Sequence, residues 1–384
     1  MSKRNEAGSA AMMAVFLMAT LFTMFLSGYL LIEANNKVVG RQLAFYGQAS
    51  NAAQAGLVEA LAWFRKQQTQ PVTTFNPRRD LTANPPLNES DDATLGIVRD
   101  YEISRQSNVW GRYEVRRSAV TDVSVARGKT GSGIVWQVQS VGIVYVRNTS
   151  DMTVAYNAPP NRVIATQTAS PEFQRLSMVL PGQAGINSSR GDRVTLTTRA
   201  RVFGGTNIGI IYKSSTGSPS LCAYPCQVTG SPSQSQANPY DASITAVFGL
   251  QQQELINMAD IVVADESQLP PALPDMSLIV VTGNASFTAT RPLSGSGVLV
   301  VLGNLSIAAN SYSSFNGLVY VVGNYTQNAP SSVSGSIVGL SNIQLVGTGD
   351  FAEASYDRSM LQQVQQQMGQ YRYSRGISFG SSWR

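Results

Sequence analysis

The sequence predicts an α+β fold, mainly β, in which a long N-terminal helix precedes a β-rich head. Three observations lead to this class. An uncharged run over residues 8–32 continues into a helical pattern that contains no proline up to residue 68. Partly alternating apolar residues then mark short strands. Near the C-terminus, an apolar hexamer that ends in Gly-Asn recurs at intervals of 20 residues.

Composition favours an exported, turn-rich protein over a cytosolic enzyme. Charged residues make up 13% of the 384 residues, about half the usual share of roughly 25%, while glycine (33) and proline (17) are plentiful. The net charge of +5 is thinly spread, and no aromatic residues interleave with a basic stripe. We therefore predict no nucleic-acid partner.

The chemistry-bearing residue types are sparse. The chain has no histidine, which excludes Ser-His-Asp arrangements and imidazole metal sites. Its two cysteines, Cys222 and Cys226, cannot complete a zinc site alone, and in an exported protein they predict a small disulfide loop. The sequence predicts no catalytic residue, no metal and no cofactor.

The N-terminus has the features of a membrane anchor. Lys3 and Arg4 precede the uncharged run 8–32, which as a helix spans roughly 37 Å and exceeds a hydrocarbon core of about 30 Å. Basic residues on this side predict a single-pass inner-membrane protein with a cytoplasmic N-terminus. The run is longer than the apolar region of a cleaved secretory signal, and no A-x-A site closes it.

The helical pattern continues beyond the anchor as an amphipathic spine, so we expect one helix of about 60 residues. Its apolar face comprises Phe45, Ala49, Ala52, Ala53, Gly56, Leu57, Ala60, Leu61 and Phe64.

The segment 42–64, with its motif Ala52-Ala53-Gln54-Ala55-Gly56-Leu57, resembles the N-terminal region of PilX-type minor pilins. Gln54 stands where that family usually has Glu. The resemblance implies a prepilin-like leader, 1–8, that is cleaved between Gly8 and Ser9, followed by a transmembrane and spine helix, 9–68. The fifth mature residue would be Met13.

Major pilins carry a Glu at that fifth position, which neutralises the N-terminal amine of a neighbouring subunit. Burying that amine without a partner is costly, so Met13 favours a component of the filament tip over a self-stacking subunit.

A pilin-like α+β region is expected over 69–180. We predict strands at 97–104, 112–126, 134–146, 162–168 and 176–180, with a glycine-rich hairpin turn at 127–133. A spine helix with an antiparallel meander is the architecture that the resemblance implies.

The recurring hexamer predicts a parallel β-helix, or solenoid, over 181–346. We expect the corner glycines to adopt positive φ and the corner asparagines to bond one another as a ladder. The Asn-x-Ser/Thr pattern at these corners also matches glycosylation acceptors, although the shared register indicates repeat corners first. The corner residues are Gly283, Asn284, Gly303, Asn304, Gly323 and Asn324.

Two further segments belong to this head. Strands at 193–202 and 206–212 are expected to join the stack, while 213–277, with a helical piece near 246–258, is expected to project as an insertion. The C-terminal segment 347–384 contains an amphipathic helix near 359–370. It is predicted to cap the open end of the solenoid, and a docking tail for a partner is the alternative.

These features predict a non-catalytic minor pilin or pilus-tip component that functions in assembly, adhesion or partner display. Expected partners are other minor pilins and pilus-tip proteins, the inner membrane through residues 8–32, and a carbohydrate or host surface; the final location is the pilus or cell surface. One alternative is a single-span envelope protein that displays a solenoid.

A polysaccharide-acting enzyme is the other alternative. Such chemistry needs two carboxylates, and residues 276–349 contain no Asp, Glu, Lys or His. The nearest acidic residues lie outside that stretch and show no site-like spacing: Asp192, Asp241, Asp260, Asp265 and Glu266.

Overall fold

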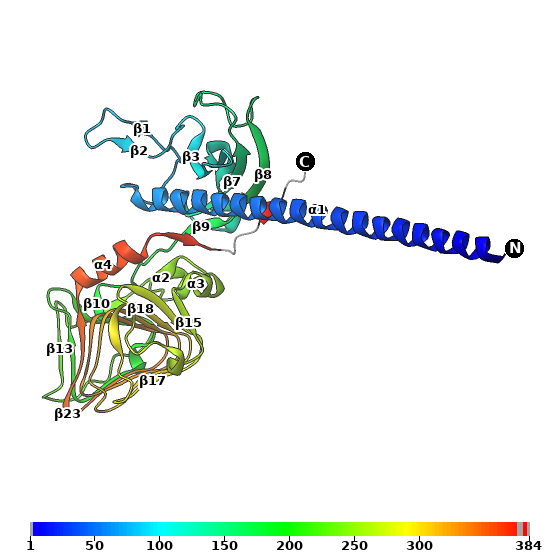
Figure 1. The fold of residues 1–384 in the computed structure, drawn as a ribbon. Coiled ribbons are helices and arrows are strands. Elements are labelled where there is room, and N and C mark those ends of the chain that lie inside the picture. Colours follow the sequence, from blue (N-terminus) through cyan, green and yellow to red (C-terminus); the bar gives the residue numbers. More distant parts are fainter. Residues whose placement is uncertain (1–2, 375–378, 382–384) are drawn as a thin grey trace.

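The computed structural model describes residues 3–374 and 379–381. Its longest element is α1 (Lys3–Lys66), one unbroken helix of 64 residues. The N-terminal part of α1 projects away from the rest of the chain, and its C-terminal part lies along a β-rich body (Figure 1). Anchor and spine therefore form a single helix, as the sequence predicts.

Two antiparallel sheets form the body beside α1. The first has the strand order β25-β8-β7-β4-β3, and α1 packs against it. The second has the order β24-β9-β6-β5. The strands are β3 (Gly96–Ser104), β4 (Val109–Arg116), β5 (Val120–Asp122), β6 (Val135–Val138), β7 (Ser140–Val146), β8 (Arg162–Ala169), β9 (Glu172–Arg175), β24 (Tyr371–Tyr373) and β25 (Phe379–Ser381), with a separate β1 (Arg79–Asp80) and β2 (Leu87–Asn88) hairpin.

Three strand predictions need correction in this body. The expected strand 112–126 is β4 and β5, separated by a 3₁₀ turn (Arg117–Ala119), and a second such turn (Val125–Arg127) follows. The expected strand 134–146 divides into β6 and β7 of different sheets, because the apolar spacing from Val138 to Val141 breaks the alternation. Residues 176–180 form no strand, since their backbone bonds reach Val247 and Phe248 in a helical segment.

The head is a curled sheet of parallel strands, which confirms the predicted solenoid. Equivalent hexamer positions lie in register across the coils, so that Ile279, Leu299 and Val319 are neighbours. The repeat strands are β16 (Ser277–Val281), β17 (Ala285–Phe287), β18 (Ser294–Val301), β19 (Leu305–Ile307), β20 (Ser313–Val321), β21 (Tyr325–Asn328), β22 (Ser331–Gly339) and β23 (Ile343–Tyr356).

The coils are not stacked in chain order. Along one side the order is β15-β16-β18-β20-β22-β10-β12-β14. The chain therefore enters the stack in the middle, runs to one end, crosses to the other end and returns to a seam where β22 meets β10. The remaining strands are β10 (Ala184–Ser188), β11 (Val194–Phe203), β12 (Ile208–Lys213), β13 (Gln227–Thr229), β14 (Gln234–Ala237) and β15 (Ile261–Val263).

The segment 213–277 differs from the projecting insertion that we expected. Strands β13 and β14 pair with β11 and β12, and β15 pairs with β16, so this segment supplies both end coils. Between them, α2 (Ile244–Phe248) and α3 (Gln252–Met258) cover the outer face of the sheet. The end strands need a partner for their backbone groups, and the stack provides one.

Apolar side chains fill both sides of the β16–β22 layer. One cluster lies inside the coils and includes Ile279, Leu299 and Val319. A second cluster lies outside them, where α4 (Arg358–Met368) buries Leu361 and Val364. Helix α4 therefore covers the side of the solenoid, not its open end.

The C-terminal segment returns to the first body. Strand β24 pairs antiparallel with β9, so that Tyr371 lies opposite Arg175, and β25 pairs with β8. The whole solenoid is consequently inserted between two adjacent strands of the antiparallel body, which differs from the boundaries expected at 180 and 347. The two bodies meet at α4 and β24 (Figure 1).

Candidate functional surfaces

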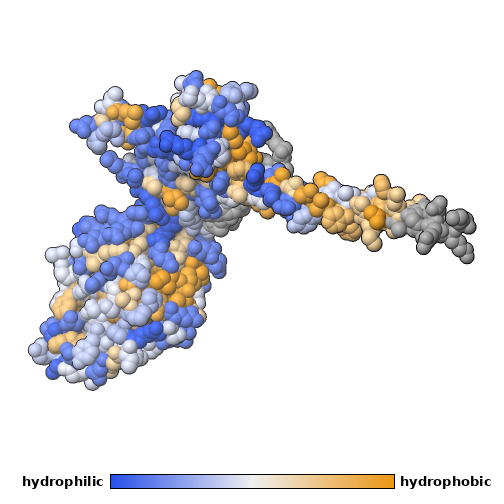
Figure 2. Space-filling view, viewed as in Figure 1, coloured by the Kyte–Doolittle hydropathy of each residue, from blue (hydrophilic) through white to orange (hydrophobic). Residues whose placement is uncertain are grey.

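The anchor lies entirely outside both folded bodies. Gly8 and Ser9 lie within α1, and the candidate membrane span, which begins at Met12, has a mean hydropathy of 2.1 in its most apolar window with none of that window buried. Met13 is 71% exposed. Figure 2 shows the apolar residues along the projecting helix. In length and composition, this part of α1 is suited to cross a membrane.

The spine motif is divided between two faces of α1. Ala52, Ala53 and Leu57 are fully buried against the antiparallel body, and Gly56 is buried beside them. A Cβ added to Gly56 would lie 2.4 Å from the Ser140 hydroxyl and 3.1 Å from the Tyr113 ring, so a larger residue would require these two side chains to move. Gln54 and Ala55 are exposed on the opposite face.

A charged cluster, which we did not predict, holds α1 to the sheet. The Glu59 carboxylate accepts hydrogen bonds from Arg99 (3.1 Å) and from the Tyr113 hydroxyl. Arg99 also bonds Asp91 at 2.8 Å. Burial and the bond to Glu59 raise the pKa of Tyr113. The available sequence signal was that Glu59 is the sole charged residue of the segment 42–64.

The repeat corners stack by a different mechanism from the one expected. The side-chain carbonyl of Asn284 accepts from the backbone N–H of Asn304 (2.8 Å), and Asn304 does the same for Asn324 (2.9 Å). Each asparagine therefore bonds the next backbone, not the next side chain. The corner glycines do not have positive φ; a Cβ on Gly303 would lie 2.5 Å from the carbonyl oxygen of Gly283. Close approach between coils, not left-handed geometry, requires glycine here.

A second glycine column, also not predicted, bends the strands. Gly297, Gly317 and Gly335 are in register and have φ values of +126°, +136° and +136°. A Cβ on Gly317 would lie 2.0 Å from the Gly297 carbonyl oxygen. The spacing of 20 and 18 residues between these glycines is visible in the sequence and could have indicated their column.

The disulfide loop lies at one end of the solenoid. Cys222 and Cys226 are joined, with Cα atoms 5.6 Å apart, and both pack against the inner core beside Val228. Tyr224 at the tip of the loop is 86% exposed. The loop shapes this end and leaves an aromatic side chain in solvent.

The acidic residues considered for catalysis are held in local contacts. Asp192 pairs with Arg190, and Asp260 accepts from Arg372 (2.7 Å) and from a backbone N–H (2.8 Å). The others accept from neighbouring backbone N–H groups, which are Ser243 for Asp241, Ser267 for Asp265 and Ser286 for Glu266. Among the described residues there is no group of three His, Cys, Asp or Glu able to hold a metal.

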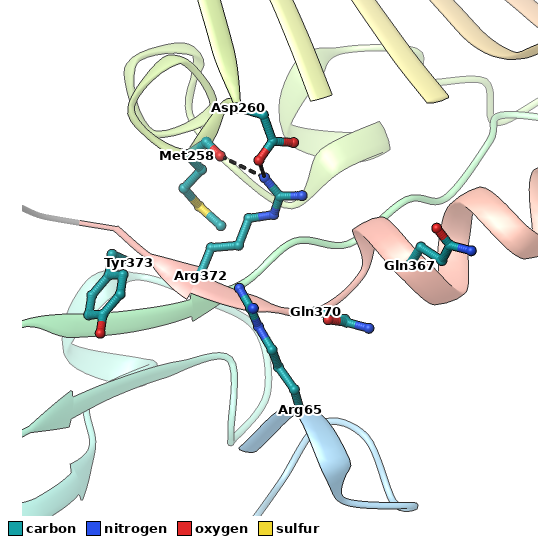
Figure 3. Close-up of a pocket in the computed structure, with 7 residues that line it drawn as sticks. All are labelled: Arg65, Met258, Asp260, Gln367, Gln370, Arg372 and Tyr373. Carbon is teal, nitrogen blue, oxygen red and sulfur yellow. Dashed lines mark hydrogen bonds and ion pairs between the residues drawn. The ribbon is translucent and has the colours of Figure 1, made fainter. Parts of the chain in front are cut away.

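A polar cavity of about 360 Å³ marks the junction of the two bodies (Figure 3). Arg65 at the end of α1 donates to the Tyr371 carbonyl at 2.8 Å. Arg372 reaches the other way, to Asp260 and to the Met258 carbonyl at 3.1 Å. Burial and the nearby Arg372 lower the pKa of Arg65. Strand β24 thus contacts the end of the spine through Tyr371 and the solenoid through Arg372.

No family model matches the sequence, and no curated protein is similar to it. Among solved structures, the competence-associated pilin ComZ from Thermus thermophilus is a weak likeness. Its TM-score is 0.19 at 10% sequence identity, over 88% of this chain and 98% of that chain. A score this low carries no argument, so any functional inference rests on the residues of the chain itself.

Proposed function

We propose that this chain is a non-catalytic minor component of a type IV pilus, which displays a β-solenoid at the filament tip. The observation that carries the proposal is α1, a single helix that serves both as an apolar anchor and as the spine of an antiparallel body. The leader, 1–8, is removed from this helix after export of the head.

The exposed face of the spine supports assembly with other pilins. Val58 is 61% exposed and lies with Ala55 on the side of α1 that turns away from the body, and Leu43 is 66% exposed on the part of α1 that precedes Ala49, its first buried residue. Apolar residues on an unpaired helix face are suited to pack against other helices. Met13 in place of an acidic residue restricts the chain to the tip.

Cell fractionation tests this proposal. In a pilus-forming host, the chain is expected in the sheared-pilus fraction, and Gly8→Glu is expected to retain it in the membrane. Gly28→Ala is the matched control within the same helix, because a Cβ at Gly28 meets nothing within 4 Å. Retention of wild type in the membrane would favour a static envelope protein, whereas equal shearing of wild type and Gly8→Glu would contradict leader processing.

A further inference from the structure

One side of the solenoid presents a row of polar side chains along the stack, which begins with three serines. Outward positions of adjacent strands lie in register from β18 to β13. We call this row the serine face, and it comprises Ser294, Ser314, Ser332, Glu353, Arg201 and Gln227. Because parallel strands lie about 4.8 Å apart, the face offers a polar group at each such interval.

The serine face has no unbalanced charge of its own. Arg201 and Glu353 form an ion pair at 3.2 Å, and the Arg201 guanidinium also lies over the Phe351 ring, 3.1 Å from its centroid. Ser332 donates to Ser314 at 3.3 Å. The backbone groups beneath are already paired within the sheet ladders, so an extended peptide gains no main-chain bonds here.

A shallow cavity of about 290 Å³ lies on this face, and an aromatic side chain borders it. Tyr312 is 75% exposed and has a φ of +52°, an uncommon conformation for an aromatic residue. Two buried serines hold the backbone on either side of Tyr312. The Ser313 hydroxyl donates to the Ser311 hydroxyl (3.0 Å) and accepts from the Leu293 backbone N–H (3.0 Å). A strained backbone that holds a large side chain in solvent is typical of a binding site.

From these features we infer that the serine face and Tyr312 bind an uncharged, linear polysaccharide. Serine hydroxyls both donate and accept, which matches sugar hydroxyls, and an aromatic ring offers a flat apolar surface for the C–H face of a sugar ring. Asp350 and Glu353 at the cavity are balanced by Arg199 and Arg201, which lie over Phe351, so the site has no net charge that would favour an ionic chain. The inference adds a ligand class to the proposed display function and rests on it only for its biological setting.

Affinity electrophoresis tests the inference on the full chain, in a zwitterionic detergent without a sugar head group. Gels contain dextran, laminarin, hydroxyethyl cellulose or soluble mannan, and alginate serves as an anionic comparison. At least one neutral polymer is expected to retard the protein. Tyr312→Ala is expected to weaken that binding at least tenfold, while Tyr312→Phe retains it.

Tyr224→Ala is the matched control, because this tyrosine is more exposed but lies on the disulfide loop beside Gln227, three strands beyond Ser332 and the cavity that Tyr312 borders. Its binding is expected to equal that of wild type, and thermal unfolding checks that every variant is folded. The inference fails if no neutral polymer retards wild type, if Tyr312→Ala binds normally, or if Tyr224→Ala loses as much. Since no pilus is present, these results are independent of leader processing.

Discussion

At the scale of single residues, glycine and asparagine set the spacing of the coils. The corner asparagines satisfy the backbone of the following coil, and the glycines remove the side chains that would separate the strands. Two separate constraints require glycine at position 317. Its φ is positive, and the Gly297 carbonyl oxygen of the neighbouring strand lies where a Cβ would be. The repeat therefore restricts residue type more strongly at its glycine positions than at its polar outward positions.

Gly317→Ala is expected to destabilise the solenoid by about 3 kcal/mol, since it adds a steric clash to backbone strain. Gly349→Ala separates the two effects, because Gly349 also has positive φ (+78°) but no atom within 4 Å of an added Cβ. Its cost is expected to be about 1 kcal/mol. Urea unfolding followed by circular dichroism measures both, and equal costs would contradict the importance of close stacking.

At the scale of elements, Asp357, the residue immediately before α4, caps the N-terminus of that helix. The Asp357 carboxylate accepts from the Met360 backbone (3.0 Å) and the Ser359 hydroxyl (2.6 Å). Bonds from Ser359 and Met360 lower the pKa of Asp357. This cap starts the helix whose apolar side covers the outer face of the solenoid.

Asp357→Ala is expected to cost about 1 kcal/mol at pH 7, whereas Asp357→Asn, which keeps a capping oxygen, costs less. Because folding lowers the pKa of Asp357, its stabilisation is complete above the unfolded value of about 3.9 and decreases as pH falls through the folded value. The gap between wild type and Asp357→Ala should therefore narrow below about pH 4. A gap that is constant from pH 7 to pH 3 would contradict the role of the charged cap.

The elements predicted correctly from the sequence are those with local signals. The anchor run, the spine periodicity and the 20-residue repeat each lie within one segment, so α1 and the stack of β16 to β22 could be predicted. Pairings between distant segments gave no such signal. Neither the seam of β10 with β22 nor the pairing of Arg175 with Tyr371 leaves a pattern in a single sequence.

The same limit applies to the candidate surfaces. Cys222 and Cys226 are close in sequence, so their disulfide could be anticipated, and the corner residues could be recognised by their register. The serine face could not be located, because strands β22, β23 and β11 become neighbours only when the chain returns to the seam. The clustering of Glu59 with Arg99 likewise requires the sheet to pack on α1.

At the scale of the whole molecule, the solenoid is an insertion in the antiparallel body. It leaves that body after Arg175 and returns at Tyr371, two residues that face each other in one sheet. Tyr371 is fully buried beside Phe64, and its hydroxyl accepts from the Val72 backbone at 2.9 Å. The spine and the C-terminal strand therefore complete one core.

Replacing residues 176–370 with Asn-Gly should leave a folded antiparallel body, because a two-residue turn of this type joins directly paired antiparallel strands. Cooperative thermal unfolding and dispersed NMR signals are the expected result. The control is a chain that ends after Arg175. It lacks Tyr371, which is fully buried in the core, and should not fold. Equal behaviour of the two shortened chains would show that the solenoid is not a separable insertion.

We propose that α1 is first a membrane anchor with a leader and then the spine of a pilus component. The most direct test is the mature N-terminal residue, measured by mass spectrometry on the full chain expressed with a prepilin peptidase. A chain that begins at Ser9 is the expected result. A mature protein that retains Met1 to Gly8 under these conditions would contradict the proposed processing of α1.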